Sequence, residues 1–153
     1  MTGQIILVAG HNSQARAAVS QVIARENRWP LLDVDTLSAS LVDALSSALQ
    51  DTWREVIVAP AQLNALIATM WAQVDSDIDA VVLSAPFVEQ LADPDWLNEL
   101  NYDLALRGYE ATVVYLLSRG ERHYLAPEHF LLDADTATDA LFASAAGVAR
   151  ELR

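Results

Sequence analysis

One stretch of the sequence decides the fold: Ile5-Ile6-Leu7-Val8-Ala9-Gly10-His11-Asn12-Ser13-Gln14-Ala15-Arg16-Ala17. Its five leading apolar residues predict a buried strand, and Gly10 predicts a tight turn. Apolar residues at helical spacing then predict a helix from about Ser13 to Asn27, with its inner face formed by Ala17, Ala18, Val22 and Ile23. A strand, a glycine turn and a helix in this order are typical of the first unit of an α/β sheet.

The same stretch has the layout of a phosphate-binding loop, G-x-x-x-x-G-K-[ST], placed between a strand and a helix. Gly10 matches the first glycine, whereas Ala15, Arg16 and Ala17 replace the second glycine, the lysine and the hydroxyl that would hold Mg²⁺. No lysine elsewhere can substitute, because all nine basic residues are arginines. The sequence therefore argues against ordinary Mg-ATP phosphoryl transfer. The candidate binding residues of this loop are Gly10, His11, Asn12, Ser13, Gln14 and Arg16.

Composition narrows the class of protein. The 153 residues contain no linker or repeat, so we expect a single domain over 1–153. A formal charge of -12 disfavours nucleic-acid binding and anionic membrane surfaces. The chain has no cysteine, no apolar run near the ~20 residues of a membrane span, and no signal-peptide pattern. We therefore expect a cytoplasmic protein.

The rest of the chain alternates apolar strands with helical segments, which predicts a doubly wound α/β fold with a parallel sheet. The expected later strands are 30–34, Ala80–Ser84, 111–117 and 129–132. The expected later helices are 37–50, 61–74, 94–107 and a last helix capped by Asp135 or Thr136 that ends near Leu152. Because ligands bind at the carboxyl ends of such strands, residues 10–17, 33–36, 84–87 and 118–122 should surround one cleft.

In their order and spacing, these segments resemble the small P-loop kinases of the zeta-toxin and chloramphenicol-phosphotransferase type. The resemblance rests on the glycine loop, Leu31-Leu32-Asp33-Val34-Asp35-Thr36-Leu37, Val58-Ala59-Pro60-Ala61, Val81-Val82-Leu83-Ser84-Ala85-Pro86-Phe87 and Gly108-Tyr109-Glu110-Ala111-Thr112-Val113-Val114-Tyr115-Leu116. It implies a three-layer sandwich around a five-stranded parallel sheet of order 2-3-1-4-5. It also implies a loop for ATP phosphates, an aspartate near the acceptor hydroxyl, an aspartate that helps to hold Mg²⁺, and an arginine-bearing lid.

Most phosphate-handling positions depart from that pattern. Ser84 stands where the strand-three carboxylate would be, and the lid looks truncated, since 118–122 leads almost directly to 129–132. Only Asp33 and Asp35 match. We therefore predict a catalytically inactive P-loop-kinase-like binding or regulatory protein that acts through a protein partner or self-association. It would need no cofactor or metal, and Arg16, Arg119 and the loop amides could hold one small anion.

Two alternatives stay open at the level of sequence. The first is an active kinase of a small hydroxylated metabolite or antibiotic, using ATP and Mg²⁺. Arg16 would replace the loop lysine, Asp33 would act as base with Asp35 beside it, and Arg119 and Arg122 would form a minimal lid. The second is a small-molecule binder that does not need nucleotide.

Other signals have ordinary explanations. Asp33 and Asp35 could cap a helix, with Asp35 the better placed if that helix starts near Leu37. The acidic segment 75–79 begins like a calcium loop but lacks the later glycine and glutamate, so a turn is expected. The scattered histidines suggest no zinc site. Four tryptophans are many for this length, and Trp53 is the one expected to face a partner.

Overall fold

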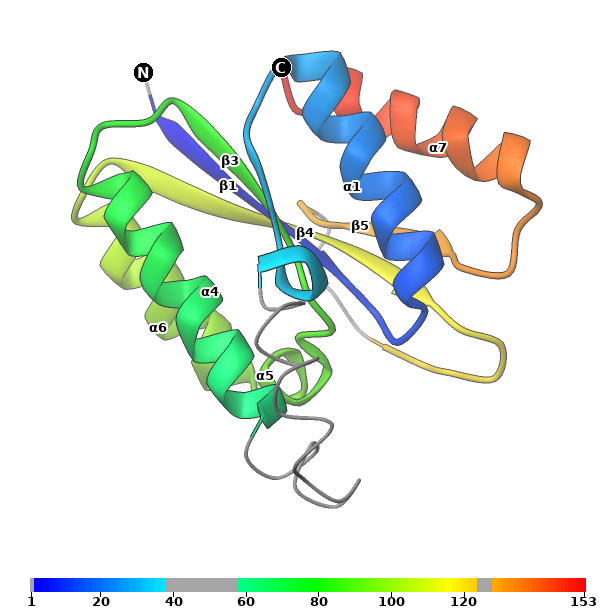
Figure 1. Ribbon diagram of the computed structural model, residues 1–153, viewed down its shortest axis with the longest axis horizontal. Helices are drawn as coiled ribbons and strands as arrows, with labels where there is room; N and C mark the ends of the chain where they lie inside the picture. Colours follow the sequence, from blue (N-terminus) through cyan, green and yellow to red (C-terminus); the bar gives the residue numbers. More distant parts are fainter. Residues whose placement is uncertain (1, 38–57, 124–127) are drawn as a thin grey trace.

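The computed structural model describes residues 2–37, 58–123 and 128–153 (Figure 1). These residues form a five-stranded, all-parallel sheet of order β2-β3-β1-β4-β5. The strands are β1 (Gly3–Ala9), β2 (Leu31–Asp33), β3 (Ala80–Ser84), β4 (Tyr109–Leu117) and β5 (Phe130–Asp133). The predicted fold class and strand order are confirmed.

Helices cover both faces of this sheet, which gives three layers (Figure 1). One face carries α1 (Ser13–Asn27) and α7 (Thr138–Glu151), which lie against each other. The other face carries α4 (Ala59–Val74), the short α5 (Val88–Ala92) and α6 (Pro94–Ala105). The helix expected over 37–50 lies, except for Leu37, outside the described residues.

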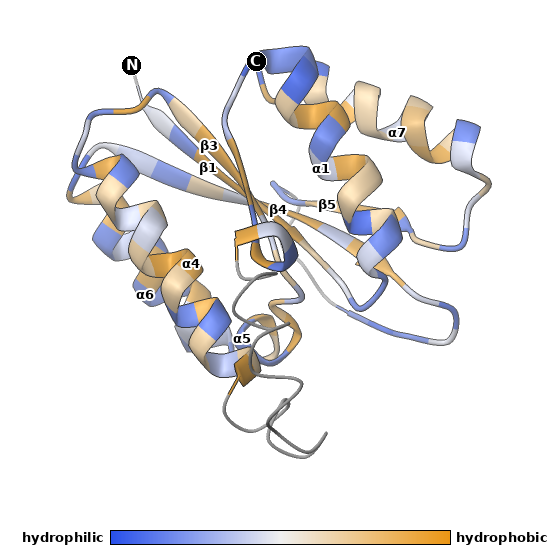
Figure 2. Ribbon diagram, viewed as in Figure 1, coloured by the Kyte–Doolittle hydropathy of each residue, from blue (hydrophilic) through white to orange (hydrophobic). Residues whose placement is uncertain are grey.

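The apolar run of β1 is continuous because both of its faces are buried. Ile5 and Leu7 pack in the core beneath α4 and α6, whereas Ile6 and Val8 pack in the core beneath α1 and α7. All four side chains are fully buried. Figure 2 shows the strands at the centre of the molecule coloured as hydrophobic between the two helical layers. Burial on both faces is the usual state of a central parallel strand.

Of the two aspartates expected as possible caps after β2, Asp33 is the cap and Asp35 is not. The backbone turns helical at Val34, before Leu37, because Asp33 Oδ1 accepts hydrogen bonds from the amides of Asp35 (2.8 Å) and Thr36 (3.2 Å). The Asp35 carboxylate is left for another role. The helix α7 begins at Thr138 without a side-chain cap, so the cap expected at Asp135 or Thr136 is wrong.

Three tryptophans of the chain lie in the described residues, and all three are half-buried. Trp71 and Trp96 pack against the core beneath α4 and α6, and Trp29 packs against the other core. Trp53, the tryptophan expected to face a partner, lies outside the described residues. The segment 75–79 forms the expected turn between α4 and β3.

Candidate functional site

The candidate site lies at the carboxyl edge of β1, β3 and β2. The strand register sets Ser84 opposite both Val8 and Asp33. The turn after β1, Ser84 and the β2 end that carries Asp33 are therefore neighbours, as predicted. Parallel sheets bind ligands at this edge, where the ends of several strands and helix N-termini meet.

The backbone conformation and the close packing at position 10 both require a glycine. Its φ is 131°, a region that other residues rarely adopt. A Cβ added here would lie 2.5 Å from the carbonyl oxygen of Leu116, at the end of the neighbouring β4. Its amide donates to the Pro86 carbonyl after β3 at 3.0 Å. Gly10 therefore lets the ends of three central strands approach closely.

The turn after β1 is short because α1 begins at Ser13. Asn12 caps the helix: its Oδ1 accepts the Ala15 amide and its carbonyl accepts the Arg16 amide, both at 3.0 Å. The amides of Ala15 and Arg16 are therefore already bonded within the helix. Gly10, His11 and Asn12 alone lie between the end of β1 and the start of α1. Ser13 and Gln14 are exposed in the first helical turn.

Arg16 is buried beneath this turn, with a relative exposure of 3%. Its Nη2 lies 3.8 Å from Asp35 Oδ2, which brings together two of the predicted site residues. Its Nε and Nη1 have no hydrogen-bond partner in the described structure. Burial lowers the pKa of the guanidinium, and the charges of Asp35 and Asp33 oppose that change. Arginine nevertheless keeps its proton in proteins, so this is a buried cation with two unused donors.

Ser84 adds a second unsatisfied group at the same edge. Its side chain is fully buried and its Oγ has no partner in the described structure. No base among the described residues accepts a hydrogen bond from this hydroxyl, so none is placed to activate it as a nucleophile. At the carboxyl edge, the Arg16 guanidinium and the Ser84 hydroxyl thus both lack hydrogen-bond partners among the described residues, and both lie near Asp33.

A second cluster, which the sequence did not reveal, lies where β4 ends. Glu121 accepts hydrogen bonds from the Tyr115 hydroxyl through Oε1 and from the Ser118 amide through Oε2, the latter at 3.0 Å. His11 Nε2 lies 3.8 Å from the same Oε1. Tyr115 also stacks on His123 with ring centroids 4.2 Å apart. One carboxylate therefore ties the turn after β1 to the end of β4 and the loop beyond it.

The pKa values in this cluster are shifted by burial and hydrogen bonding. Burial is the largest cause that raises the pKa of the Tyr115 hydroxyl, and the Glu121 carboxylate adds to it. For Glu121 itself, burial opposes the shift, but the bonds from Tyr115 and Ser118 outweigh it and lower the pKa of the carboxyl. The hydroxyl stays protonated and the carboxylate stays charged near neutral pH, which suits a structural clamp.

The loop arginines lie apart from Arg16. Arg119 and Arg122 are exposed, and neither forms an ion pair among the described residues. Residues 124–127, which follow them, lie outside the described residues, so the truncated lid stays a prediction. Within the described ranges, no three histidine, aspartate or glutamate side chains are grouped to hold a metal ion. No helix there is long and apolar enough to cross a membrane.

Solved structures that resemble this chain include kinases. An inferred kinase from Chloroflexus aurantiacus matches with a TM-score of 0.67 and 15% identity over 94% of this chain and 97% of that one. Shikimate kinase from Aquifex aeolicus matches with a TM-score of 0.57 and 11% identity over 97% of both chains. A gluconokinase from Sinorhizobium meliloti matches with a TM-score of 0.53 and 16% identity over 99% of this chain and 93% of that one.

The fold is that of the P-loop kinases. No family model and no curated protein matches the sequence. Because the identities are this low, the structural likeness carries the fold of a P-loop kinase and not its chemistry. The finer resemblance to the zeta-toxin and chloramphenicol-phosphotransferase type stays a prediction.

Proposed function

We propose that this chain is a catalytically inactive P-loop-kinase-like protein, which acts by binding a protein partner or a second copy of itself. The observation that carries the proposal is the early start of α1 at Ser13. Because the helix starts there, the amides of Ala15 and Arg16 donate to Asn12. In a phosphate-binding loop, backbone amides are instead free to bind the nucleotide.

The side chains at this site do not fit Mg-nucleotide either. Ala17 has no hydroxyl for Mg²⁺, and Ser84 offers no carboxylate. Arg16 is buried and lies beside Asp35, whereas the loop lysine of the motif reaches out to the β- and γ-phosphates. Phosphoryl transfer depends almost entirely on positioning and charge stabilisation, so these losses act together. The degenerate loop and the shortened lid belong to this proposal.

One compact anion is a more suitable ligand for this edge. Arg16 Nε and Nη1 are unused donors among the described residues, and an unpaired buried donor costs about 1–3 kcal/mol. A carboxylate- or phosphate-sized anion could satisfy them, with support from the positive end of α1. Asp33 and Asp35 limit the size and charge of such a ligand, since both lie near the guanidinium.

Thermal unfolding of the full chain with ATP, ADP or GTP, each with Mg²⁺, tests the proposal. We expect no shift in Tm, whereas a nucleotide at 100 times its Kd would add about 2.7 kcal/mol. We expect phosphate or acetate to raise Tm, and Arg16→Met to abolish that rise. Arg150→Met is the matched control, because Arg150 is exposed on α7 and should leave the anion effect intact. A nucleotide-dependent rise in Tm would contradict the proposal.

The alternative, an ATP-dependent kinase of a small hydroxylated molecule, has one observation in its favour. Asp33 and Asp35 both lie close enough to Arg16 for their charges to raise the pKa of its guanidinium against the lowering effect of burial. A catalytic base (Asp33) and a phosphate-binding cation (Arg16) would lie close together in this way. Against it, one Asp33 oxygen already accepts two backbone amides. ATP turnover that falls in Asp33→Asn, with folding unchanged, would establish this alternative.

A further inference from the structure

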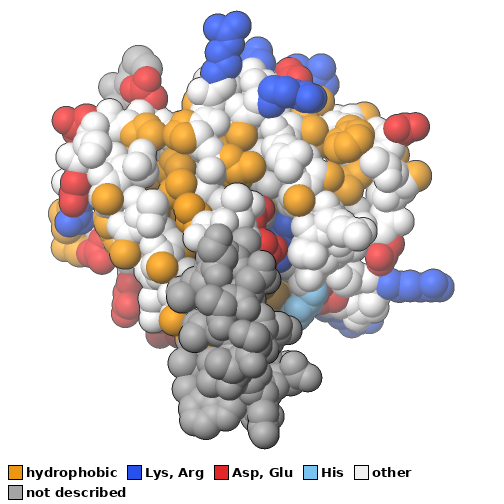
Figure 3. Space-filling view, viewed as in Figure 1, with side chains coloured by type: hydrophobic (Ala, Val, Ile, Leu, Met, Phe, Trp, Pro, Cys, Tyr) orange, Lys and Arg blue, Asp and Glu red, His pale blue; other side chains and the backbone are white. Residues whose placement is uncertain are grey.

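Four of the nine arginines gather at one end of the molecule, opposite the candidate site. Arg25 and Arg28 lie at the end of α1, and Arg150 and Arg153 lie at the end of α7. The two ends are joined, because Asn27 donates to the Ala149 carbonyl at 3.0 Å and Arg153 Nε donates to Asn27 Oδ1 at 2.7 Å. Figure 3 shows basic side chains gathered at the top of the view, over these helix ends.

The guanidinium of Arg153 donates hydrogen bonds to Asn27 Oδ1 and to the Glu26 carbonyl, but no carboxylate pairs with any of the four arginines in the described part of the chain. The whole chain nevertheless carries a formal charge of -12. Glu26 and Glu151 stand at the same two helix ends, so the four arginines outnumber the acids there and leave a positive excess that an acidic partner can recognise.

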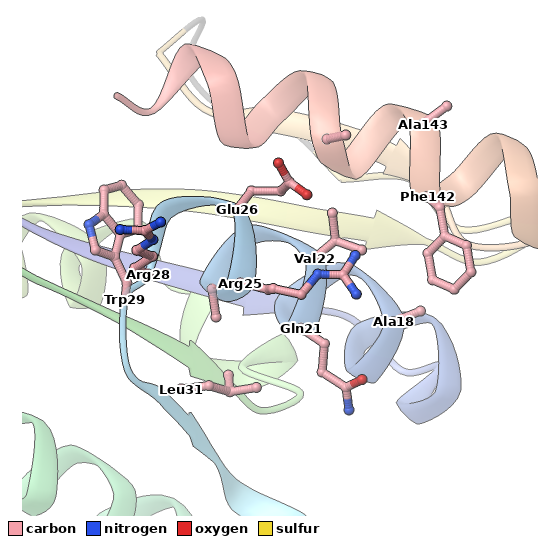
Figure 4. Close-up of a pocket in the computed structure, with 12 residues that line it drawn as sticks. Ala18, Gln21, Val22, Arg25, Glu26, Arg28, Trp29, Leu31, Phe142 and Ala143 are labelled. Carbon is pink, nitrogen blue, oxygen red and sulfur yellow. The ribbon is translucent and has the colours of Figure 1, made fainter.

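A groove of about 850 Å³ runs beside these arginines, along α1 between α7 and the start of β2 (Figure 4). Its apolar lining includes Val22 from α1, Leu31 from β2 and Phe142 from α7, with Trp29 at the end near Arg28. Phe142 is 41% exposed. Arg25, Glu26 and Arg28 also line it, and an apolar groove whose rim carries more arginine than glutamate suits the apolar face of an amphipathic helix that also carries acidic residues.

The outer face of α6 has that composition. Tyr102 and Leu106, one turn apart, are each 68% exposed, more than any other large apolar side chain in the described residues. Glu99 and Asp103 lie beside them, and both are exposed. Neither of these acids forms an ion pair among the described residues. Apolar side chains this exposed, flanked by unpaired charge, are typical of an interaction surface.

We infer that α6 of one copy of this chain docks in the groove of a second copy. Tyr102 and Leu106 would enter between Leu31 and Phe142, and the acids Glu99 and Asp103 would face Arg25 and Arg28. Both surfaces belong to this chain, and their charges and apolar contents are complementary. The inference names the partner of the proposed binding function and rests on it.

The geometry fixes the kind of assembly. The groove is on the α1 and α7 side of the sheet, whereas α6 is on the opposite side. One neighbour therefore occupies the groove and a different neighbour receives α6. Such a contact is heterologous, and it produces a closed ring or an open chain of copies.

Sedimentation equilibrium of the full chain over a range of concentrations tests the inference. We expect self-association in low salt that weakens as salt is added, because the rim charges are solvent-exposed. Arg25→Glu with Arg28→Glu should weaken association by about tenfold or more, and so should Glu99→Arg with Asp103→Arg. Mixing the two variants should restore association, since each retains the surface that the other has lost and the two reversed surfaces again carry opposite charges.

Matched controls separate local from global charge effects. Arg119→Glu with Arg122→Glu makes the same change in net charge away from the groove, and Asp79→Arg with Asp135→Arg does so for the acids. Both controls should associate like the unmodified chain. Circular dichroism verifies that every variant is folded, and Tyr102→Ala serves as a second α6 variant that keeps all charges.

Three outcomes overturn the inference. The first is a chain that stays monomeric at the highest concentration reached. The second is association that both groove and α6 variants leave unchanged; it leaves the proposed function standing, with another contact surface. The third is a failure of the two variants to associate when mixed. Nucleotide binding would instead contradict the proposed function and leave the self-association result to be judged by itself.

Discussion

At the scale of single residues, Gly10 is explained by strand packing. Its amide hydrogen bond, its positive φ and its close contact with Leu116 all arise because the ends of β1, β3 and β4 approach closely at this residue. Gly10→Ala should lower the free energy of unfolding by about 1–3 kcal/mol, because it combines backbone strain with a clash against a main-chain oxygen. Urea denaturation measures this.

Gly120→Ala is the control for backbone strain alone. Gly120 has a φ of 81°, but a Cβ there would meet nothing within 4 Å. We expect it to cost about 1 kcal/mol. Equal losses for the two variants would show that the contact with Leu116 is unimportant.

Sequence-based prediction identified some residues of the site but not their contacts. Gly10 and Arg16 could be selected from the motif, Asp33 and Asp35 from the resemblance to the small P-loop kinases, and the structure brings them to one edge of the sheet. What Arg16 contacts could not be read from the motif, because its burial depends on where α1 begins. Glu121 was missed since its role depends on Tyr115 from β4 and His11 from the β1 turn, which no local pattern connects to it.

At the scale of elements, the edge of β4 is closed by side chains before β5 begins. The Val113 amide donates to His129 Nδ1 at 3.1 Å, and the Ala111 amide donates to Asn101 Oδ1 at 3.2 Å. Strand pairing with β5 starts only at Val114. His129 therefore continues, by one hydrogen bond, the ladder that joins β5 to the sheet, and it must be unprotonated at Nδ1 to accept that bond.

This contact predicts that the pairing of β4 with β5 is destabilised by acid. Burial lowers the pKa of His129, and the nearby Glu128 charge opposes that shift. The unfolded chain, with an ordinary histidine pKa of about 6.5, then binds a proton before the folded chain does. Stability should therefore be complete above about pH 6.5 and fall as the pH drops through the lowered folded value.

Urea midpoints measured from pH 7.5 down to about pH 5 test this dependence. His129→Asn keeps an acceptor but cannot titrate, so its midpoints should fall less steeply than those of the unmodified chain. His11→Asn is the control, since the His11 side chain is 62% exposed. Parallel slopes for His129→Asn and the unmodified chain would sink the prediction.

The positions of the strands and helices were the features that the sequence predicted best. Apolar period and glycine punctuation located all five strands to within two residues at each end. For the central strands β1 and β3, burial on both faces leaves an unbroken apolar run. The cap after β2 is Asp33 and not Asp35, and the cap expected after β5 is wrong, because Asp33 and Asp133 each accept a hydrogen bond from the amide two residues on, a local choice that several acidic residues in a row leave open.

At the scale of the whole molecule, the charge of -12 and pI near 4.3 imply electrostatic self-repulsion near neutral pH. Added NaCl should therefore raise the Tm of the folded monomer, because screening acts more strongly on the compact state. The same salt should weaken head-to-tail association. Dilute samples in calorimetry isolate the first effect, and a Tm that falls with salt in the monomer would contradict it.

The packing role of Gly10 also matters for recognising related chains. A glycine that the sheet itself requires persists whether or not a nucleotide is ever bound, so its presence says little about activity. In searches for active members among proteins of this fold, the first glycine of the motif should count for less than the lysine and the hydroxyl that follow it. The residue where the first helix begins is the more informative criterion, because it decides how many backbone amides are left to meet a ligand.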